Sequence, residues 1–180
     1  VGQGDGARLG LAVAQALPQR FVGAWLMDAW PTADVPPALA QWLQAAANKP
    51  TWDVAQGWVQ AGFGPLTHEQ QALAAIPFAQ AGHRAALKAW PKVQAQLPAV
   101  PQALLAAWLA QGRCLISHSA SNRLMPWNAW HAAWQTAVPA LLQHPQALRQ
   151  TPMSPMVPDL AATSVQQAME YFAASAKTAV

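Results

Sequence analysis

The sequence predicts an α/β fold with parallel strands, because segments of strand length flank a long stretch of helical pattern. Residues 21–27 (FVGAWLM) form a continuous apolar run, which is typical of a parallel strand buried on both faces. Residues 113–119 (RCLISHS) form a second segment of strand length. Between them, residues 31–110 carry only short amphipathic segments separated by proline or glycine, which indicates an all-helical insertion.

The segments before and within the insertion carry their own helix signals. Residues 7–17 (ARLGLAVAQAL) place large apolar residues in a background of small ones, and Pro18 ends this helix. Within the insertion, Thr67 followed by Glu69 and Gln70 resembles the start of a helix. The insertion therefore contains several short helices and no predicted strand.

The C-terminal part returns to alternating strands and helices. Residues 126–138 place three tryptophans on one helical face, which favours packing in the core over a partner-facing surface. Residues 146–151 are a candidate for a short final strand, and residues 162–176 form the closing helix, with Thr163 or Ser164 as its N-cap. The three tryptophans are Trp127, Trp130 and Trp134.

The composition excludes several classes of protein. Of the 180 residues, 53% are apolar and only 9% are charged, so the chain can bury enough surface to fold and disorder is excluded. The net charge of +3 comes from scattered cations that form no cluster, so we expect no nucleic-acid partner. Polar residues and prolines interrupt every long apolar stretch, so we expect no membrane span. Cys114 has no partner for a disulfide and fits a reducing, cytoplasmic location.

The N-terminus carries a motif with the spacing of a nucleophile turn. Residues 2–6 read Gly-Gln-Gly-Asp-Gly, and this spacing matches the turn that presents the nucleophile of α/β-hydrolases. Such a turn joins a strand to a helix and needs small residues on both sides, because its central residue lies in a strained corner. A helix with Gly10 and the buried strand at residues 21–27 follow, as the motif requires.

With these flanking elements the chain resembles the α/β-hydrolase superfamily, and most closely the haloalkane dehalogenases. The resemblance starts at the turn and covers nearly all of the chain. Its most specific stretch runs from residues 77–82 (PFAQAG) to residues 88–92 (KAWPK), which is similar to the helical cap of that family. The resemblance implies that residues 1–30 and 111–180 form part of a main domain and that residues 31–110 form a helical cap.

The resemblance also implies a catalytic site, and this chain has lost its main groups. The nucleophile position falls on Gly4, which has no side chain, and the base position falls on Pro155, which cannot transfer a proton. The next position, where the family has a tryptophan that holds the departing halide, is Asp5, and a carboxylate repels a halide. Asp28 and Asn122 match the two alternative positions of the catalytic acid.

Other residues are alternatives for the site. Asp5 could act as nucleophile only if the register of the turn shifted by one residue. His118 could replace the lost base, or it is a buried structural histidine. Phe78 and Trp90 would bind substrate between cap and main domain, or they form the core of the cap. The histidines have no partners at ligand spacing, so we expect no metal and no cofactor.

Two functions remain open. The losses at Gly4 and Pro155 favour a catalytically inactive member of the family that binds an apolar small molecule or a partner chain under its cap. The alternative is an active hydrolase, either a dehalogenase or an esterase-like relative, with residues supplied by missing N-terminal sequence or by a partner chain. The strands that precede the turn in the family are not in this sequence. We therefore expect an exposed strand edge, and self-association or a complementary chain that covers it.

Overall fold

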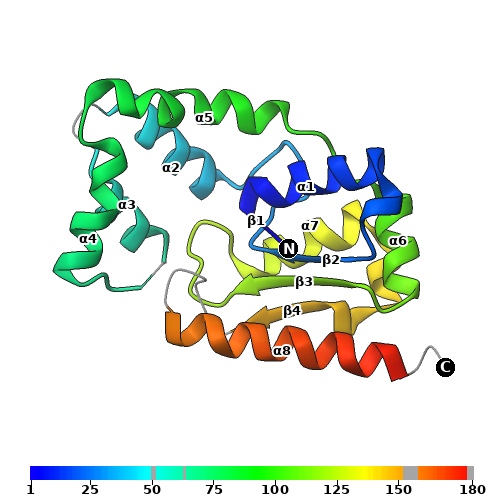
Figure 1. Cartoon of the computed structure of the whole chain (residues 1–180). Coiled ribbons are helices and arrows are strands. Elements are labelled where there is room, and N and C mark those ends of the chain that lie inside the picture. The colour runs from blue at the N-terminus through cyan, green and yellow to red at the C-terminus, as the bar shows by residue number, and fades with distance from the viewer. Residues whose placement is uncertain (50–51, 63, 152–157, 178–180) are drawn as a thin grey trace.

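The computed structural model describes residues 1–49, 52–62, 64–151 and 158–177 (Figure 1). Short 3₁₀ turns join several of its helices. The strands and α-helices, in chain order, are β1 (Gly2–Gln3), α1 (Gly4–Ala16), β2 (Ala24–Met27), α2 (Pro37–Asn48), α3 (Val54–Ala61), α4 (His68–Ala75), α5 (Ala85–Gln96), α6 (Gln102–Ala110), β3 (Cys114–Ser119), α7 (Trp127–Ala137), β4 (Leu148–Thr151) and α8 (Pro158–Lys177).

The four strands form one parallel sheet in the order β1-β2-β3-β4, which confirms the predicted α/β fold. The three predicted strands are all present, but β2 begins only at Ala24 because Phe21 and Val22 lie exposed before it. Gly23 allows this entry, since a side chain there would collide with the backbone of Arg113. Each crossover between neighbouring strands contains at least one helix, as parallel pairing requires.

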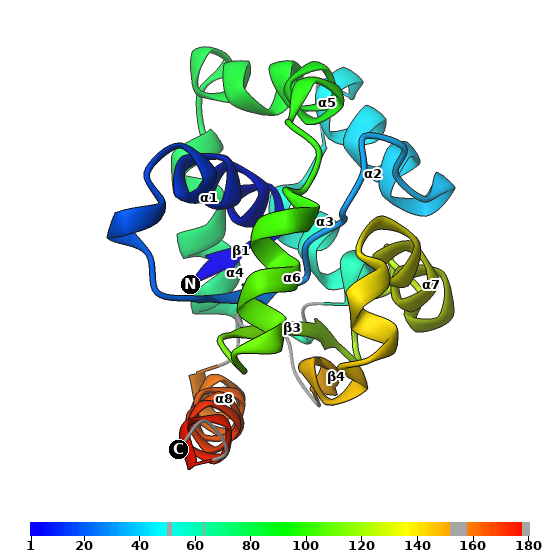
Figure 2. The same ribbon diagram turned by 90° about the vertical axis from the view of Figure 1, so that its right-hand side faces the viewer.

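Helices cover both faces of the sheet, so residues on both faces of its central strands are buried. In Figure 2, α1, α6 and α7 lie on one side and α8 lies on the other. Leu26 and Ile116 share the core with α6, whose Leu105 and Leu109 are buried. On the α8 side, the Tyr171 hydroxyl donates to the carbonyl of Cys114 over 2.8 Å. All six residues of β3 are buried, as expected for a strand packed on both faces.

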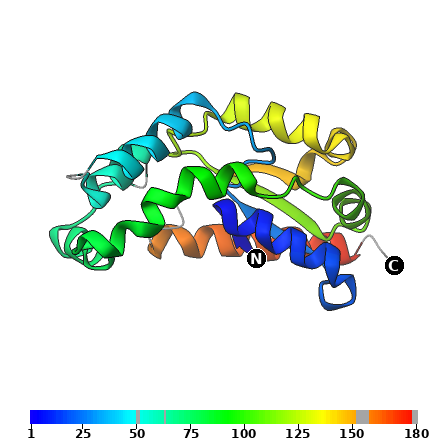
Figure 3. The same ribbon diagram turned by 90° about the horizontal axis from the view of Figure 1, so that it is seen from above.

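Within residues 31–110 the described residues contain helices and turns and no strand, as the sequence predicts. Helices α2 to α5 form a separate layer beyond the carboxyl ends of the strands (Figures 1 and 3), with its own apolar cluster around Trp52 and Leu87. Helix α6, by contrast, packs against the sheet through Leu105 and Leu109. The helical layer therefore ends before α6, and the predicted segment divides between that layer and the sheet.

Helix starts follow the sequence signals in one place and depart from them in another. Thr67 caps α4 in a capping box with Gln70: each side chain bonds the backbone N–H of the other residue. Thr163 and Ser164 do not cap α8, because this helix begins at Pro158 and includes them. The predicted cap of the last helix is therefore wrong, because the helix begins five residues before Thr163.

Arg8 ties helix α1 to both chain segments that connect the sheet to the helical layer. Its side chain is 2% exposed, and it donates to the carbonyl of Thr32 in the segment before α2. It also donates to the carbonyls of Leu97 and Pro98 in the segment after α5, over 2.6 to 3.1 Å. Burial lowers the pKa of Arg8, and the nearby Asp5 carboxylate partly opposes this shift. Arg8 therefore holds the entry and the exit of the helical layer at the same helix.

Candidate functional site

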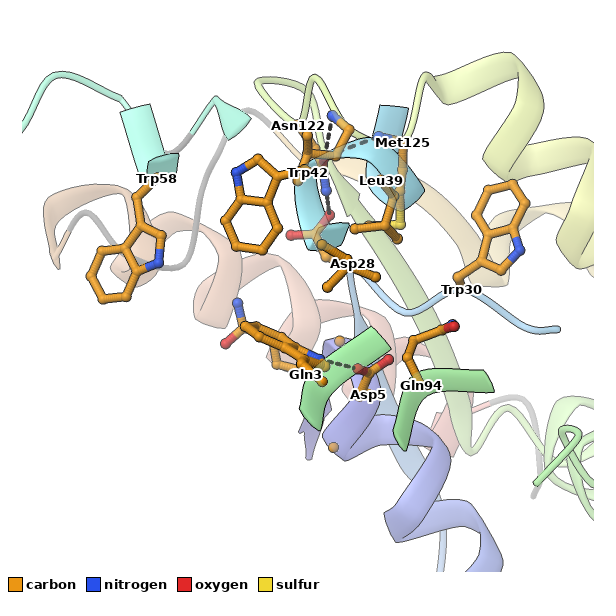
Figure 4. Close-up of a pocket in the computed structure, with 15 residues that line it drawn as sticks. Gln3, Asp5, Asp28, Trp30, Leu39, Trp42, Trp58, Gln94, Asn122 and Met125 are labelled. Atoms are coloured by element: carbon orange, nitrogen blue, oxygen red, sulfur yellow. Dashed lines mark hydrogen bonds between the residues drawn. The ribbon is translucent and has the colours of Figure 1, made fainter. Parts of the chain in front are cut away.

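A cavity of about 350 Å³ lies between the carboxyl ends of the strands and the helical layer (Figure 4). This volume is at the lower end of the range for small-molecule sites, about 300–1,000 Å³. The sheet contributes residues that follow β1, β2 and β3, and helices α2, α3 and α5 contribute the opposite wall. The edge where parallel strands end is where α/β folds usually bind ligands. We call this space the central cavity.

The strand-to-helix corner at Gly4 forms the floor of the central cavity. Gly4 has φ +51°, in the left-handed region, and α1 begins at this residue directly after β1. A Cβ atom at Gly2 would lie 2.6 Å from the Cα of Ala7, so the corner is tight on that side. A Cβ atom at Gly4 would meet no atom within 4 Å. The corner thus has space for a side chain at Gly4, and the sequence leaves that space empty.

Asp5 connects the corner to the helical layer. The indole N–H of Trp90, on α5, donates to Oδ2 of Asp5 over 2.7 Å. Both residues line the central cavity, and Asp5 is partly exposed in the first turn of α1, where the helix dipole favours a negative charge. Asp5 stands where the resemblance implies a halide-binding N–H donor, and it acts here as a hydrogen-bond acceptor. The indole N–H of Trp90 is already hydrogen-bonded to the Asp5 carboxylate.

Asp28 follows β2 and lines the central cavity on the side opposite Asp5 (Figure 4). It is 6% exposed and has φ +47°, which is uncommon for a residue with a side chain. Its Oδ1 accepts from the backbone N–H of Ser119 at 2.8 Å and from Asn122 Nδ2 at 3.3 Å, and its Oδ2 accepts from the Ser119 hydroxyl at 2.5 Å. These donors fix the carboxylate in one orientation. The two candidate acid positions, Asp28 and Asn122, are thus in contact.

His118 lies under α7 and does not line the central cavity. Its ring packs against Trp127 and Trp130, and its Nε2 donates to the carbonyl of Met125 over 2.6 Å. Burial lowers the pKa of His118, although the Met125 carbonyl and the Asp28 carboxylate oppose the shift. The imidazole is therefore neutral at pH 7. The Nε2 atom is thus bonded within the fold, and the Nδ1 atom is buried with no hydrogen-bond partner among the described residues.

Four tryptophans line the central cavity, of which the sequence predicted only Trp90. Trp30 follows β2, and Trp42 and Trp58 come from α2 and α3. The rings of Trp42 and Trp90 meet edge to face, with centroids 5.8 Å apart. Sequence reasoning missed these residues because an isolated tryptophan in a helical segment looks the same whether it packs in a core or faces a cavity. Gln94 and Met125 were also missed, because their sequence positions do not show that their side chains face a cavity.

Five predicted site residues meet at the central cavity: Gly4, Asp5, Asp28, Trp90 and Asn122. Phe78 lies elsewhere and packs against the apolar cluster of the helical layer. Pro155, at the predicted base position, is outside the described residues.

Searches with this sequence find no matching family model and no matching curated protein. Among the described residues, no three His, Cys, Asp or Glu side chains are grouped so that they could hold a metal ion. In the same part of the chain, no helix has the length and apolarity needed to cross a membrane.

Proposed function

We propose that this chain is a binding protein on an α/β-hydrolase-like scaffold, similar to haloalkane dehalogenases, and that it holds a small apolar molecule without hydrolysing it. The observation that carries the proposal is the central cavity with Gly4 at its corner. The cavity has the size and the aromatic lining of a ligand site. Gly4 supplies open space at the place where the resemblance puts a nucleophile.

The carboxylates that line the central cavity are held as acceptors. Nucleophilic catalysis needs an attacking group and a base that activates water for the second step. Asp28 accepts three hydrogen bonds, which hold its two oxygens toward Ser119 and Asn122. Asp5 accepts from Trp90. His118 does not line the cavity, and Pro155, at the predicted base position, cannot transfer a proton. These features support binding over turnover.

Binding can be tested with cyclohexylmethanol, a neutral probe of eight heavy atoms, by isothermal titration calorimetry. We expect one saturable site per chain. The variant Leu39→Trp places a larger ring in the wall of the central cavity and should abolish binding. The control Leu73→Trp lies on the surface of α4, where Leu73 is 58% exposed, and should bind as the unmodified chain does. Equal binding by both variants would overturn the proposal.

Turnover can be tested with 1-bromobutane and 4-nitrophenyl butyrate. We expect no steady release of bromide or nitrophenol above the buffer rate. Gly4→Asp should release at most one equivalent of bromide, because an alkyl ester on the new carboxylate would lack a base for hydrolysis. The pair Gly4→Asp and Pro155→His tests whether both losses matter. Steady turnover by the unmodified chain, abolished by Asp5→Asn or His118→Gln, would show that the alternative, an active hydrolase, is right.

A further inference from the structure

The central cavity is electrically unlike the rest of the chain. Asp5 and Asp28 both line it, and among the described residues no lysine, arginine or histidine does, although the net charge of the whole chain is +3. Arg8 is near Asp5, but its guanidinium is bound to three backbone carbonyls beneath the helical layer. His118, the titratable group near Asp28, is buried and neutral. A ligand in this cavity therefore meets two carboxylates with no cation beside it on the wall.

Three of the four tryptophans that line the central cavity have their indole N–H groups bonded within the protein, so these three offer rings and no free N–H donor to a ligand. The indole N–H of Trp42 donates to the carbonyl of Gly57 over 2.9 Å, and that of Trp90 donates to Asp5. The indole N–H of Trp30 donates to Thr32 and to the carbonyl of Asp34. The face of an indole ring attracts cations, most strongly when water is excluded.

Gln94 supplies a third observation that points to a polar group on the ligand. Its side chain lines the central cavity from α5 and is only 4% exposed. Its amide makes no hydrogen bond to any other described residue. Buried amides are nearly always hydrogen-bonded, so an amide that faces the central cavity without a protein partner is suited to a ligand. Its carbonyl oxygen can accept from an N–H group.

We infer that the ligand of the central cavity is a small organic cation, a primary ammonium group on an apolar body. Asp28 and the Gln94 carbonyl would accept its N–H groups, and the rings of Trp42 and Trp90 would surround the apolar part. This inference rests on the proposed function, since it names the chemical class of the ligand of the same cavity. It also explains why a site on this scaffold carries Asp5, a residue that opposes halide binding.

Three probes of the same shape test the inference. They are cyclohexylmethylamine, cyclohexylmethanol and cyclohexanecarboxylate, measured by calorimetry at pH 7.5 and low salt, where the amine is a cation and the acid an anion. We expect the amine to bind at least about tenfold more tightly than the alcohol, and the carboxylate not to bind. The preference should weaken as salt is added, because part of it is electrostatic.

Variants locate the charge that is responsible. Asp28→Asn keeps the shape and the left-handed backbone, which Asn tolerates, and should remove most of the preference for the amine. Asp5→Asn should reduce it less, because Arg8 already lies near Asp5. Asp53→Asn is the control, because Asp53 is the N-cap of α3, does not line the cavity, and can be replaced as a cap by Asn. This variant should keep the full preference for the amine. Circular dichroism shows whether each variant is folded. If Asp28→Asn does not fold, the inference is judged from the preference for the amine over the alcohol in the unmodified chain and from its reduction in Asp5→Asn.

The outcomes separate the two proposals. If the alcohol binds as tightly as the amine, or if the preference survives in the folded Asp28→Asn and Asp5→Asn variants, the inference is overturned and the proposed function stands. If none of the three probes binds, the proposed function fails and the inference fails with it.

Discussion

Replacing Arg8 with methionine should loosen the attachment of the helical layer to the sheet. The substitution keeps an unbranched apolar stem but removes every donor of the guanidinium. The carbonyls of Thr32, Leu97 and Pro98 would lose their partner at both ends of the segment that contains α2 to α5. We expect a less stable fold and weaker binding of cyclohexylmethanol, because this segment forms one wall of the central cavity.

The size of the effect follows from the burial of each hydrogen bond. The bond from Arg8 to the carbonyl of Leu97 is buried, and a buried carbonyl left without a donor costs about 1–3 kcal/mol. The bonds to Thr32 and Pro98 are partly buried, so water can replace part of them. Burial lowers the pKa of Arg8, so removing the guanidinium also recovers some desolvation free energy. The net loss should be about 2–4 kcal/mol, or roughly 5–12 °C in Tm for a chain of this length.

Urea denaturation followed by circular dichroism measures this loss. Arg20→Met is the matched control, because Arg20 is exposed on a surface turn, and its stability should stay within about 0.5 kcal/mol of the unmodified chain. If Arg8→Met were as stable as the control and bound the probe equally well, Arg8 would not hold the helical layer.

Four further predictions follow from the same structure. Cys114 should not react with a thiol reagent at pH 8 until urea unfolds the chain, because it is fully buried and burial raises its pKa to about 12. The urea midpoint should fall as the pH decreases below about 6.5. In that range His118 of the unfolded chain takes up a proton, whereas the folded imidazole, whose pKa is lowered, does not. The variant His118→Gln should therefore show a weaker dependence of the urea midpoint on pH. Gly2→Ala should lower the free energy of unfolding by about 2–3 kcal/mol, because the new Cβ meets the backbone of Ala7. Gly4→Ala should lower it by only about 1 kcal/mol, which is the cost of a left-handed φ for alanine. Equal losses of stability in thermal unfolding would refute this geometry of the corner. Sedimentation velocity should show self-association, with binding of a hydrophobic dye, because α1 exposes a row of leucine and valine side chains beside the edge strand β1; a compact monomer that binds no dye would contradict this.

The sequence predicted the sheet better than it predicted the cavity. A strand buried on both faces is rich in apolar residues, so β2 was visible as a continuous apolar run, and β3 was predicted as a second segment of strand length. The glycine spacing at residues 2–6 predicted the corner, because a tight turn with a left-handed residue restricts which residues fit. The strand β1 has only two residues, which is too short for any periodic pattern.

The parts that sequence reasoning missed depend on how segments pack in three dimensions. The amphipathic pattern of α6 does not show whether its apolar side faces the sheet or another helix, so its place in the sheet's core was not predictable. In the same way, Trp30, Trp42 and Trp58 come from three segments that meet only after folding. Asp28 and Asn122 were predicted as alternatives for one role. The structure instead joins them in one hydrogen-bonded group.

The most direct test of the central claim is a nuclear magnetic resonance spectrum of the chain with ¹⁵N-labelled tryptophan during titration with cyclohexylmethyl acetate. Each of the ten indole N–H groups gives its own signal, which single Trp→Phe variants assign. We expect the signals of Trp30, Trp42, Trp58 and Trp90 to move saturably, with those of the buried Trp130 and Trp134 unchanged and the ester intact after a day. Shifts confined to other tryptophans would place the ligand outside the central cavity. Protein-dependent release of acetate would contradict a binding protein without hydrolytic activity.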